Sequence, residues 1–259
     1  MIQILTDTHT HTIFSQHAYG TMKENIDAAV ETGLEAIGIT DHYSNMFWPA
    51  DRFENFGNFC NRKAVPKEWK GVKVFHGVEA DIIDTKGHLF GYDRDLKDTY
   101  MKGFDGSWLD LICMNTDYAI GSVHGMDFLE GTTESQVTDM YCKVLENPHV
   151  MILGHIGRSK HTFDLETVLA CAKEKGKLVE LNQPSINRNN GYREGFATRM
   201  LTKCAEMGVG ISVGTDAHSP FDVGRFDSAI SLLNEVDFPE ELIMTRNLKS
   251  LMSVLDRID

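Results

Sequence analysis

The chain has 259 residues, 42% of them hydrophobic, which is enough to bury the core of one domain spanning residues 1–259. Its formal net charge of −13 argues against nucleic acid and anionic membranes as partners. The five cysteines lack a CxxC spacing and are odd in number, which argues against a disulfide framework and against a cysteine metal site. Neither a signal peptide nor a spanning apolar run is visible, so we expect a reduced, cytoplasmic protein. The cysteines are Cys60, Cys113, Cys142, Cys171 and Cys204.

Seven short runs rich in Val and Ile predict β-strands. In chain order they span residues 2–7, 35–40, 72–79, 118–123, 150–154, 177–182 and 209–214. Amphipathic patterns between them predict helices at residues 22–33, 133–147, 164–176 and 195–208, of which three end at Gly33, Gly176 and Gly208, as C-caps commonly do. This alternation predicts a parallel α/β architecture, and seven units without a long break favour a barrel over an open sheet.

The segment from Tyr43 to Trp69 departs from this alternation. It combines many aromatic residues with two arginines and shows little periodicity; these residues include Phe47, Trp48, Arg52, Phe53, Phe56, Phe59 and Arg62. We interpret it as a long connection whose aromatic side chains form a satellite core. The alternative is that it walls a substrate pocket.

Polar residues stand at the carboxyl end of every predicted strand, where β/α barrels place their chemistry. In chain order they are His9 and His11, Asp41 and His42, Glu79, His124, His155, Asn182, and Asp216 with His218. Residues two apart in an extended chain point to the same side, so each spaced pair can aim two ligands at one point, and His17 can fold over the same face. A single histidine is more often a core or surface residue than a ligand, but this convergence predicts a metal site.

Six motifs, in this order, resemble those of the PHP (polymerase and histidinol phosphatase) superfamily. They are DTHTHTIFSQHAYGT, ITDH, GVEADI, IGSVHG, ILGH and GTDAH. The resemblance covers nearly the whole chain, and the final stretch GTDAHSPFDVGRFDSAISLLNEVDFPEE is similar to the small stand-alone PHP phosphatases that hold three metals. It implies a distorted (β/α)7 TIM-like barrel and a metal-dependent phosphoesterase.

Carried over motif by motif, the resemblance divides nine residues among three divalent ions. His9, His11, Glu79 and Asp216 would hold the first ion, the bridging Glu79 with His124 and His155 the second, and His17, His42 and His218 the third. Zinc is the first expectation, and Mn or Fe suits the same ligands. We also expect Asp7 and Asp41, which lie next to ligands, to accept hydrogen bonds from imidazole N–H groups.

Such a centre would hydrolyse a small phosphomonoester with a metal-bound hydroxide, while the other ions take up charge on the phosphoryl oxygens. Arg158, Arg225 and Asn182 are candidate substrate contacts; Arg188 and Arg193 also follow strands, and a plain surface charge fits any one arginine equally well. Ile156, Arg158 and Arg225 depart from the family pattern without removing a ligand, so they bear on the substrate and not on the metals.

Three alternative functions stay open. The first is a dedicated histidinol-phosphate phosphatase. The second is a nuclease or proofreading phosphodiesterase, which the acidic balance and the lack of a basic stripe disfavour. The third is a non-catalytic metal-binding regulator, which the complete ligand set disfavours. The sequence does not fix the oligomeric state.

Overall fold

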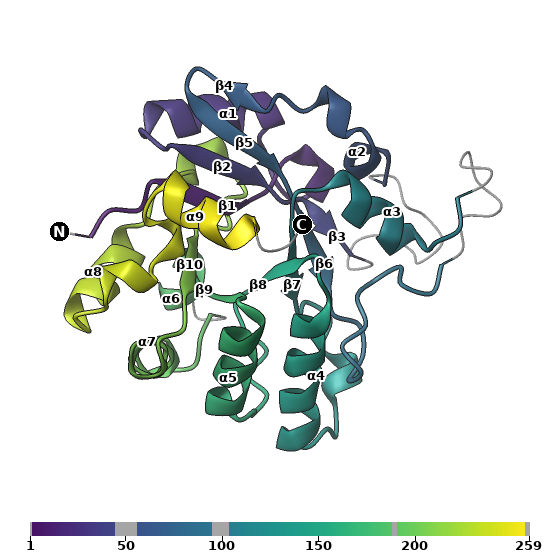
Figure 1. Ribbon diagram of the computed structural model, residues 1–259, viewed down its shortest axis with the longest axis vertical. Helices are drawn as coiled ribbons and strands as arrows, with labels where there is room; N and C mark the ends of the chain where they lie inside the picture. Colours follow the sequence, from purple (N-terminus) through teal and green to yellow (C-terminus); the bar gives the residue numbers. More distant parts are fainter. Residues whose placement is uncertain (1, 45–55, 95–103, 188–190, 257–259) are drawn as a thin grey trace.

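The computed structural model describes residues 2–44, 56–94, 104–187 and 191–256, and Figure 1 shows their arrangement. The strands are β1 Thr6–Thr10, β2 Ala36–Ile39, β3 His42–Tyr43, β4 Glu68–Trp69, β5 Val72–His76, β6 Val78–Asp81, β7 Ala119–Ser122, β8 Val150–Leu153, β9 Leu178–Asn182 and β10 Ile211–Gly214. The helices are α1 Met22–Glu31, α2 Phe56–Cys60, α3 Trp108–Asn115, α4 Glu134–Glu146, α5 Leu165–Lys175, α6 Gln183–Asn187, α7 Phe196–Met207, α8 Asp227–Glu235 and α9 Leu248–Leu255.

The strands form a closed (β/α)7 barrel with irregular pairing. One sheet has the order β1-β2-β5-β4 and the other β10-β9-β8-β7-β6-β3, and all neighbours are parallel except β4 and β5. Strand β3 follows β2 along the chain, and β6 follows β5. Each of these pairs occupies one strand position of the barrel, with its first strand in one sheet and its second strand in the other. The ring closes where the His11 amide donates to the Ala217 carbonyl at 2.9 Å, which joins β1 to the segment after β10. The predicted distorted barrel is confirmed.

A buried threonine holds the other end of the β1–β10 seam. The Thr245 carbonyl accepts from the Leu5 amide at 3.2 Å and from Thr6 Oγ1 at 3.1 Å. Its own Oγ1 accepts from the Val213 amide at 2.9 Å. A C-terminal segment therefore inserts between the first and last strands, which explains why the barrel departs from regular closure.

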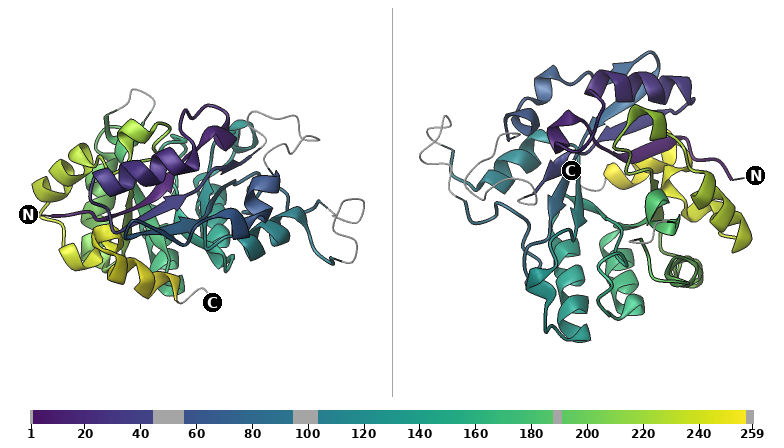
Figure 2. Two further views of the ribbon diagram at one scale, coloured as in Figure 1. Left: turned by 90° about the horizontal axis from the view of Figure 1, so that it is seen from above. Right: turned by 180° about the vertical axis from the view of Figure 1, so that it is seen from behind.

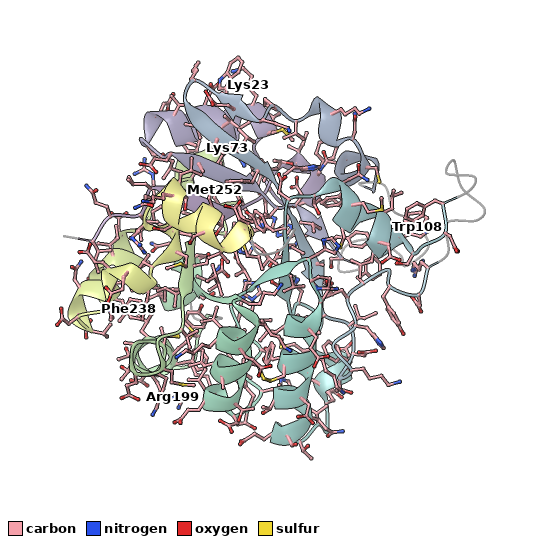
Figure 3. All side chains as sticks on the ribbon, in the orientation of Figure 1. Lys23, Lys73, Trp108, Arg199, Phe238 and Met252 are labelled. Atoms are coloured by element: carbon pink, nitrogen blue, oxygen red, sulfur yellow. A yellow bond between two sulfur atoms is a disulfide. The ribbon has the colours of Figure 1, made fainter. Side chains whose placement is uncertain are left out.

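Helix α9 packs against the amino-terminal ends of the strands. Leu251, Val254 and Leu255 are buried in one cluster with Phe75 and Tyr118. Figure 1 shows α9 in front of the strands, and the reverse view in Figure 2 shows it behind them. Figure 3 places Met252 of α9 near Lys73 of β5, and both line a pocket on this face. The carboxyl ends of the strands lie on the opposite side.

Two predicted strands differ from the observed ones. The run at residues 2–7 is shifted, because β1 pairs with β2 from Thr6 onward and continues to Thr10, so His9 lies within the strand. The run at 72–79 splits at Gly77, where a Cβ atom would lie 2.7 Å from the Thr40 side chain. Helices α3, α8 and α9 lie outside the four helical patterns predicted above.

The described part of the segment from Tyr43 to Trp69 contributes to the main core. Phe59 of α2 is fully buried, with its ring 5.8 Å from that of Tyr43 and 6.4 Å from that of His76. The satellite core is therefore wrong for Phe59, because both Phe59 and Tyr43 join the principal cluster. Phe47, Trp48, Arg52 and Phe53 lie outside the described residues.

A disulfide joins Cys142 of α4 to Cys171 of α5, with 5.6 Å between the Cα atoms. The predicted absence of disulfides is wrong for this pair. Helices α4 and α5 are neighbours on the outside of the barrel, and this contact follows from packing and not from cysteine spacing. Cys60, Cys113 and Cys204 are thiols.

Reduction of this disulfide is expected to lower the free energy of unfolding by about 3–4 kcal/mol on the chain-entropy account, because the bond joins residues 29 positions apart. Urea unfolding with and without reductant measures the change. Cys142→Ser should match the reduced protein, and the control Cys60→Ser should keep the sensitivity to reductant. Identical unfolding of wild-type protein in both conditions would contradict the prediction.

Candidate metal centre

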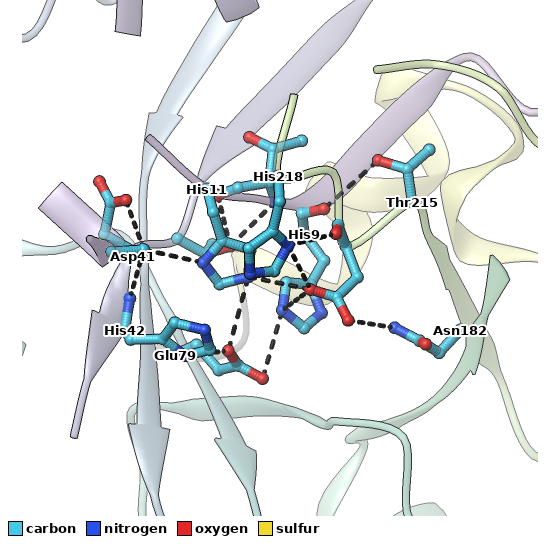
Figure 4. A network of polar contacts seen from close by, with 12 residues as sticks. His9, His11, Asp41, His42, Glu79, Asn182, Thr215 and His218 are labelled. Carbon is cyan, nitrogen blue, oxygen red and sulfur yellow. Dashed lines mark hydrogen bonds and ion pairs between the residues drawn. The ribbon is translucent and has the colours of Figure 1, made fainter. Parts of the chain in front are cut away.

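The nine predicted ligands come together at the carboxyl ends of the strands, and we call them the nine-residue cluster. They are His9, His11, His17, His42, Glu79, His124, His155, Asp216 and His218. Figure 4 labels five members, from β1, the segment after it, β3, β6 and the segment after β10, around one point. His17 joins from the loop after β1, with its ring 4.3 Å from that of His218 and 5.1 Å from that of His42.

Glu79 lies at the centre of the nine-residue cluster and is fully buried. Its Oε1 lies 3.3 Å from His9 Nε2, 3.3 Å from His124 Nε2 and 3.1 Å from His155 Nε2. Its Oε2 lies 2.7 Å from His42 Nδ1 and 3.5 Å from His11 Nε2. Each oxygen thus faces a different group of imidazoles, which suits a carboxylate that bridges two cations.

Asp216 faces Glu79 across the cluster. Its Oδ1 lies 3.1 Å from His11 Nε2 and 3.6 Å from His9 Nε2. The backbone φ is +49° at Asp216 and +30° at His155, in a region that non-glycine residues rarely adopt. Strain of this kind concentrates where side-chain direction matters for function.

The donor set fits divalent metal ions. Three groups bring their ligand atoms within 4.8 Å of one another: His11, His42 and His218; His9, His11 and Glu79; and His42, Glu79 and His124. Nε2 of His9, His11 and His218, and Oε2 of Glu79, are buried and make no hydrogen bond of good geometry within the described residues, although His11 Nε2 and Glu79 Oε2 lie within ion-pair distance of other members of the cluster. Because buried polar atoms are nearly always bonded, such orphaned atoms aimed at one another point to cations between them.

The electrostatics of the cluster favour the metal-binding forms of Glu79, His11 and His17, whereas carboxylates raise the pKa of His9 and His124 despite their burial. Burial alone would raise the pKa of Glu79, but the imidazoles of His124, His9 and His42 hold it well below its usual range, so the carboxylate is ionised. Burial lowers the pKa of His11 strongly and that of His17 to about 4, which leaves lone pairs on these rings. For His124, burial is outweighed by Glu79 and Asp81, which raise its pKa to about 10, so metal binding there would release a proton.

Three residues that the sequence analysis missed orient the imidazoles. Glu180 of β9 is fully buried; its Oε1 lies 2.7 Å from His9 Nδ1, and its Oε2 accepts from the His155 amide at 2.9 Å. Asp81 Oδ1 lies 2.6 Å from His124 Nδ1. Ser15 Oγ lies 3.0 Å from His11 Nδ1. A carboxylate in an otherwise apolar strand was the available signal for Glu180, and Asp81 stands two residues after Glu79.

Asp41 lies one step further from the imidazoles than predicted, and Asp7 bonds backbone and hydroxyl groups instead. Asp41 accepts from the Thr12 amide at 2.6 Å and from Ser15 Oγ at 2.7 Å, so it reaches His11 through Ser15. Asp7 accepts from Thr215 and from the Gly224 amide, and it ties β1 to the chain after β10. Burial raises the pKa of Asp7 to about 6.

The candidate substrate contacts separate into two kinds. Arg158 stands at the cluster, with Nη1 3.6 Å from Asp216 Oδ2, and Nδ2 of the Asn182 side chain donates to the same oxygen at 3.3 Å. Arg225 instead donates from Nε to the Phe221 carbonyl at 2.5 Å and holds a surface turn. Arg193 lines a groove beside α5 and α7, and Arg188 lies outside the described residues.

A family model described as the PHP domain matches residues 7–184. The chain belongs to the PHP domain family. The matched stretch contains every member of the nine-residue cluster except Asp216 and His218, which follow β10. This PHP protein therefore completes the cluster with residues beyond the matched stretch.

The PHP protein is similar to curated bacterial proteins along nearly its full length. It is 38% identical to a probable phosphatase of Clostridium botulinum (strain Hall), over 98% of this chain and 95% of the relative. It is 36% identical to a probable phosphatase of Caldanaerobacter subterraneus subsp. tengcongensis, over 98% and 92%. Histidinol phosphate phosphatase of Lactococcus lactis, solved with zinc, L-histidinol and phosphate, shares the fold at a TM-score of 0.57 and 19% identity, over 90% of this chain and 94% of that one.

Among the described helices, none combines the length and the apolar character that crossing a bilayer requires.

Proposed function

We propose that this PHP protein hydrolyses small phosphomonoesters at a centre of three divalent metal ions held by the nine-residue cluster. The observation that carries the proposal is the buried Glu79 carboxylate, which faces five imidazoles with both of its oxygens. The probable-phosphatase relatives support the reaction class, and the zinc and phosphate of the Lactococcus lactis structure support the kind of ion and substrate.

The proposed assignment divides the cluster among three ions, and the first two ions share Glu79. His9, His11, Glu79 and Asp216 hold the first ion, and Glu79, His124 and His155 hold the second. The third belongs to His17, His42 and His218, whose rings gather within 5.7 Å of one another. Zinc is the expected metal, since imidazole and carboxylate ligands suit it, and Mn or Fe fits the same donors.

The residues around the ions have separate tasks in hydrolysis. Divalent ions, when bound, lower the pKa of water and neutralise charge on phosphoryl oxygens. Glu180 and Asp81 hold the rings of His9 and His124 in fixed orientations, which raises their basicity as ligands. Arg158 keeps a 36% exposed side chain beside Asp216, where its guanidinium can bind phosphoryl oxygens.

Metal analysis followed by a substrate panel tests the proposal. We expect two to three equivalents of transition metal per chain after purification without chelator and reloading. The loaded protein should hydrolyse members of a phosphomonoester panel that includes histidinol phosphate, and chelation should abolish turnover. Less than one equivalent of metal, or a loaded protein inert against the whole panel, would contradict it; salt-sensitive binding of single-stranded DNA would favour a nuclease.

His17→Ala is expected to remove one metal ion and keep the fold. His17 lies in an exposed loop after β1, so its loss does not disturb the barrel core. Elemental analysis gives the metal count, and circular dichroism with thermal melting checks the fold. The control His161→Ala changes another loop histidine outside the cluster and should keep every ion. An unchanged metal count in His17→Ala, or global unfolding, would refute the assignment.

A further inference from the structure

The nine-residue cluster opens to solvent on one side. His9, His11 and Glu79 are fully buried, so no substrate approaches through them. His17 is exposed, the His218 side chain is 27% exposed, and the Arg158 side chain is 36% exposed. The exposed side of the cluster therefore lies where the loop after β1 carries His17 and the segment after β10 carries His218.

An exposed aromatic side chain stands on each of these two segments, and we call the two the rim pair. Tyr19 is 84% exposed and Phe221 is 82% exposed, the highest values for large apolar side chains among the described residues. Tyr19 follows His17 by two residues, and Phe221 follows His218 by three. The two loops touch, because the Tyr19 amide donates to the His218 carbonyl at 2.8 Å. Gly20 also lies against Pro220, where a Cβ atom would come within 2.6 Å of Pro220 Cγ.

The backbone under Phe221 is fixed. Ser219 Oγ accepts from the Phe221 amide at 3.4 Å, and the Phe221 carbonyl accepts from Arg225. This bond gives Arg225 a positioning role, and the direct substrate contact predicted from the sequence stays a prediction. Because this backbone is held, the Phe221 ring can contact another group at a small cost in conformational entropy, as binding surfaces require.

Exposed apolar side chains gather around the same end of the barrel. Ile13 and Phe14 follow β1 and Met126 follows β7, and all three are exposed together with the rim pair. Single exposed apolar residues are ordinary, but their concentration at the end of the barrel that carries the cluster indicates a surface that binds apolar groups.

We propose that Tyr19 and Phe221 bind the organic group of the phosphomonoester, so that the preferred substrates carry an aromatic or apolar group close to the phosphate. This inference rests on the proposed phosphatase function. The ions bind the phosphoryl group of every ester alike, so selection among esters falls to whatever contacts the remainder of the molecule. The formal charge of −13 disfavours a second anionic group there, whereas two aromatic rings favour an apolar one.

The test compares 2-phenylethyl phosphate with ethyl phosphate, which share an alkyl leaving oxygen and differ by one phenyl group. The measured quantity is the ratio of their kcat/KM values in the metal-loaded protein. We expect a wild-type ratio well above one, a fall of about tenfold in Tyr19→Ala and in Phe221→Ala, and a larger fall in the double variant. Tenfold corresponds to about 1.4 kcal/mol.

Matched controls separate the rim pair from general effects. Tyr19→Phe keeps the ring and should keep the ratio. Met114→Ala removes a 65% exposed side chain near the end of α3, away from the opening, and should also keep the ratio. Circular dichroism at equal metal content confirms that the variants are folded.

Each other outcome has a distinct meaning. A wild-type ratio near one, or a ratio unchanged in the double variant, overturns the inference. An unchanged ratio with a lower mass in light scattering would mean that the rim pair joins copies of this chain instead. If wild-type protein hydrolyses neither ester but acts on other members of the phosphomonoester panel, the inference is overturned and the proposed function stands. If the whole panel is inert, the proposed function fails. Calorimetric titration with 2-phenylethylphosphonate and ethylphosphonate then tests the rim pair separately, and equal affinities would overturn the inference.

Discussion

Glu79→Gln is expected to lower phosphomonoesterase activity by more than about a hundredfold and to weaken two metal ions together. The substitution keeps the shape of the side chain but removes the charge that, in the proposed assignment, holds two cations near each other. Changes to groups that merely orient ligands cost about tenfold to a hundredfold in affinity or activity, so loss of a bridging carboxylate costs more. The measurements are kcat/KM and metal content, compared at equal folded fraction by circular dichroism.

Asp84→Asn is the matched control for Glu79→Gln. Asp84 is also a carboxylate paired with an imidazole, since its Oδ2 lies 2.7 Å from His88 Nδ1, but this pair is partly exposed and outside the cluster. We expect its activity to stay within about twofold of wild type, as is usual for a surface ion pair of small energetic weight. Equal losses in the two variants would refute the central role of Glu79.

Glu180→Gln is expected to reduce activity by about tenfold to a hundredfold, mainly through weaker binding of the ion that His9 holds. Glu180 bonds the His9 ring with one oxygen and the His155 amide with the other, so one substitution disturbs two ligands. Gln cannot accept with both of its terminal atoms, and one of these bonds is lost. Chelator competition gives the metal affinity, and activity at saturating metal shows how much of the loss is recovered.

The control for Glu180→Gln is Glu166→Gln on α5. Glu166 is exposed and pairs with Lys203 at 2.9 Å, away from the cluster. Its metal affinity and activity should equal those of wild type. A Glu180→Gln protein with wild-type metal affinity and activity would show that His9 keeps its orientation without this carboxylate.

The strand-end residues were predictable because parallel strands of a barrel bring their carboxyl ends to one place, whatever the details of the loops. His9, Glu79 and Asp216 meet for this reason. Glu180 was not predictable in the same way, because the sequence does not show that its side chain faces His9. The direction of Arg225 depends on the turn at Phe221, and the Cys142–Cys171 bond depends on how α4 packs on α5.

The division of the third strand also escaped prediction. Residues 72–79 read as one apolar run, yet Gly77 interrupts it, and β5 pairs with β2 while β6 pairs with β7. The close approach of Thr40 and the Tyr118 ring to Gly77 creates the break, and both come from other parts of the chain. Tertiary contacts of this kind leave no local pattern.

The seam at Thr245 sets an order of events during synthesis. Thr6 emerges from the ribosome early, but its hydrogen-bond partner Thr245 is 239 positions further along the chain. Asp7 likewise bonds to Thr215, which follows 208 positions later. A nascent chain that ends before these partners carries most of the histidines but cannot close β1 onto β10. Truncated translation products thus carry exposed imidazoles without the complete metal site. The full set of ligands can bind metal only in the last stage of folding.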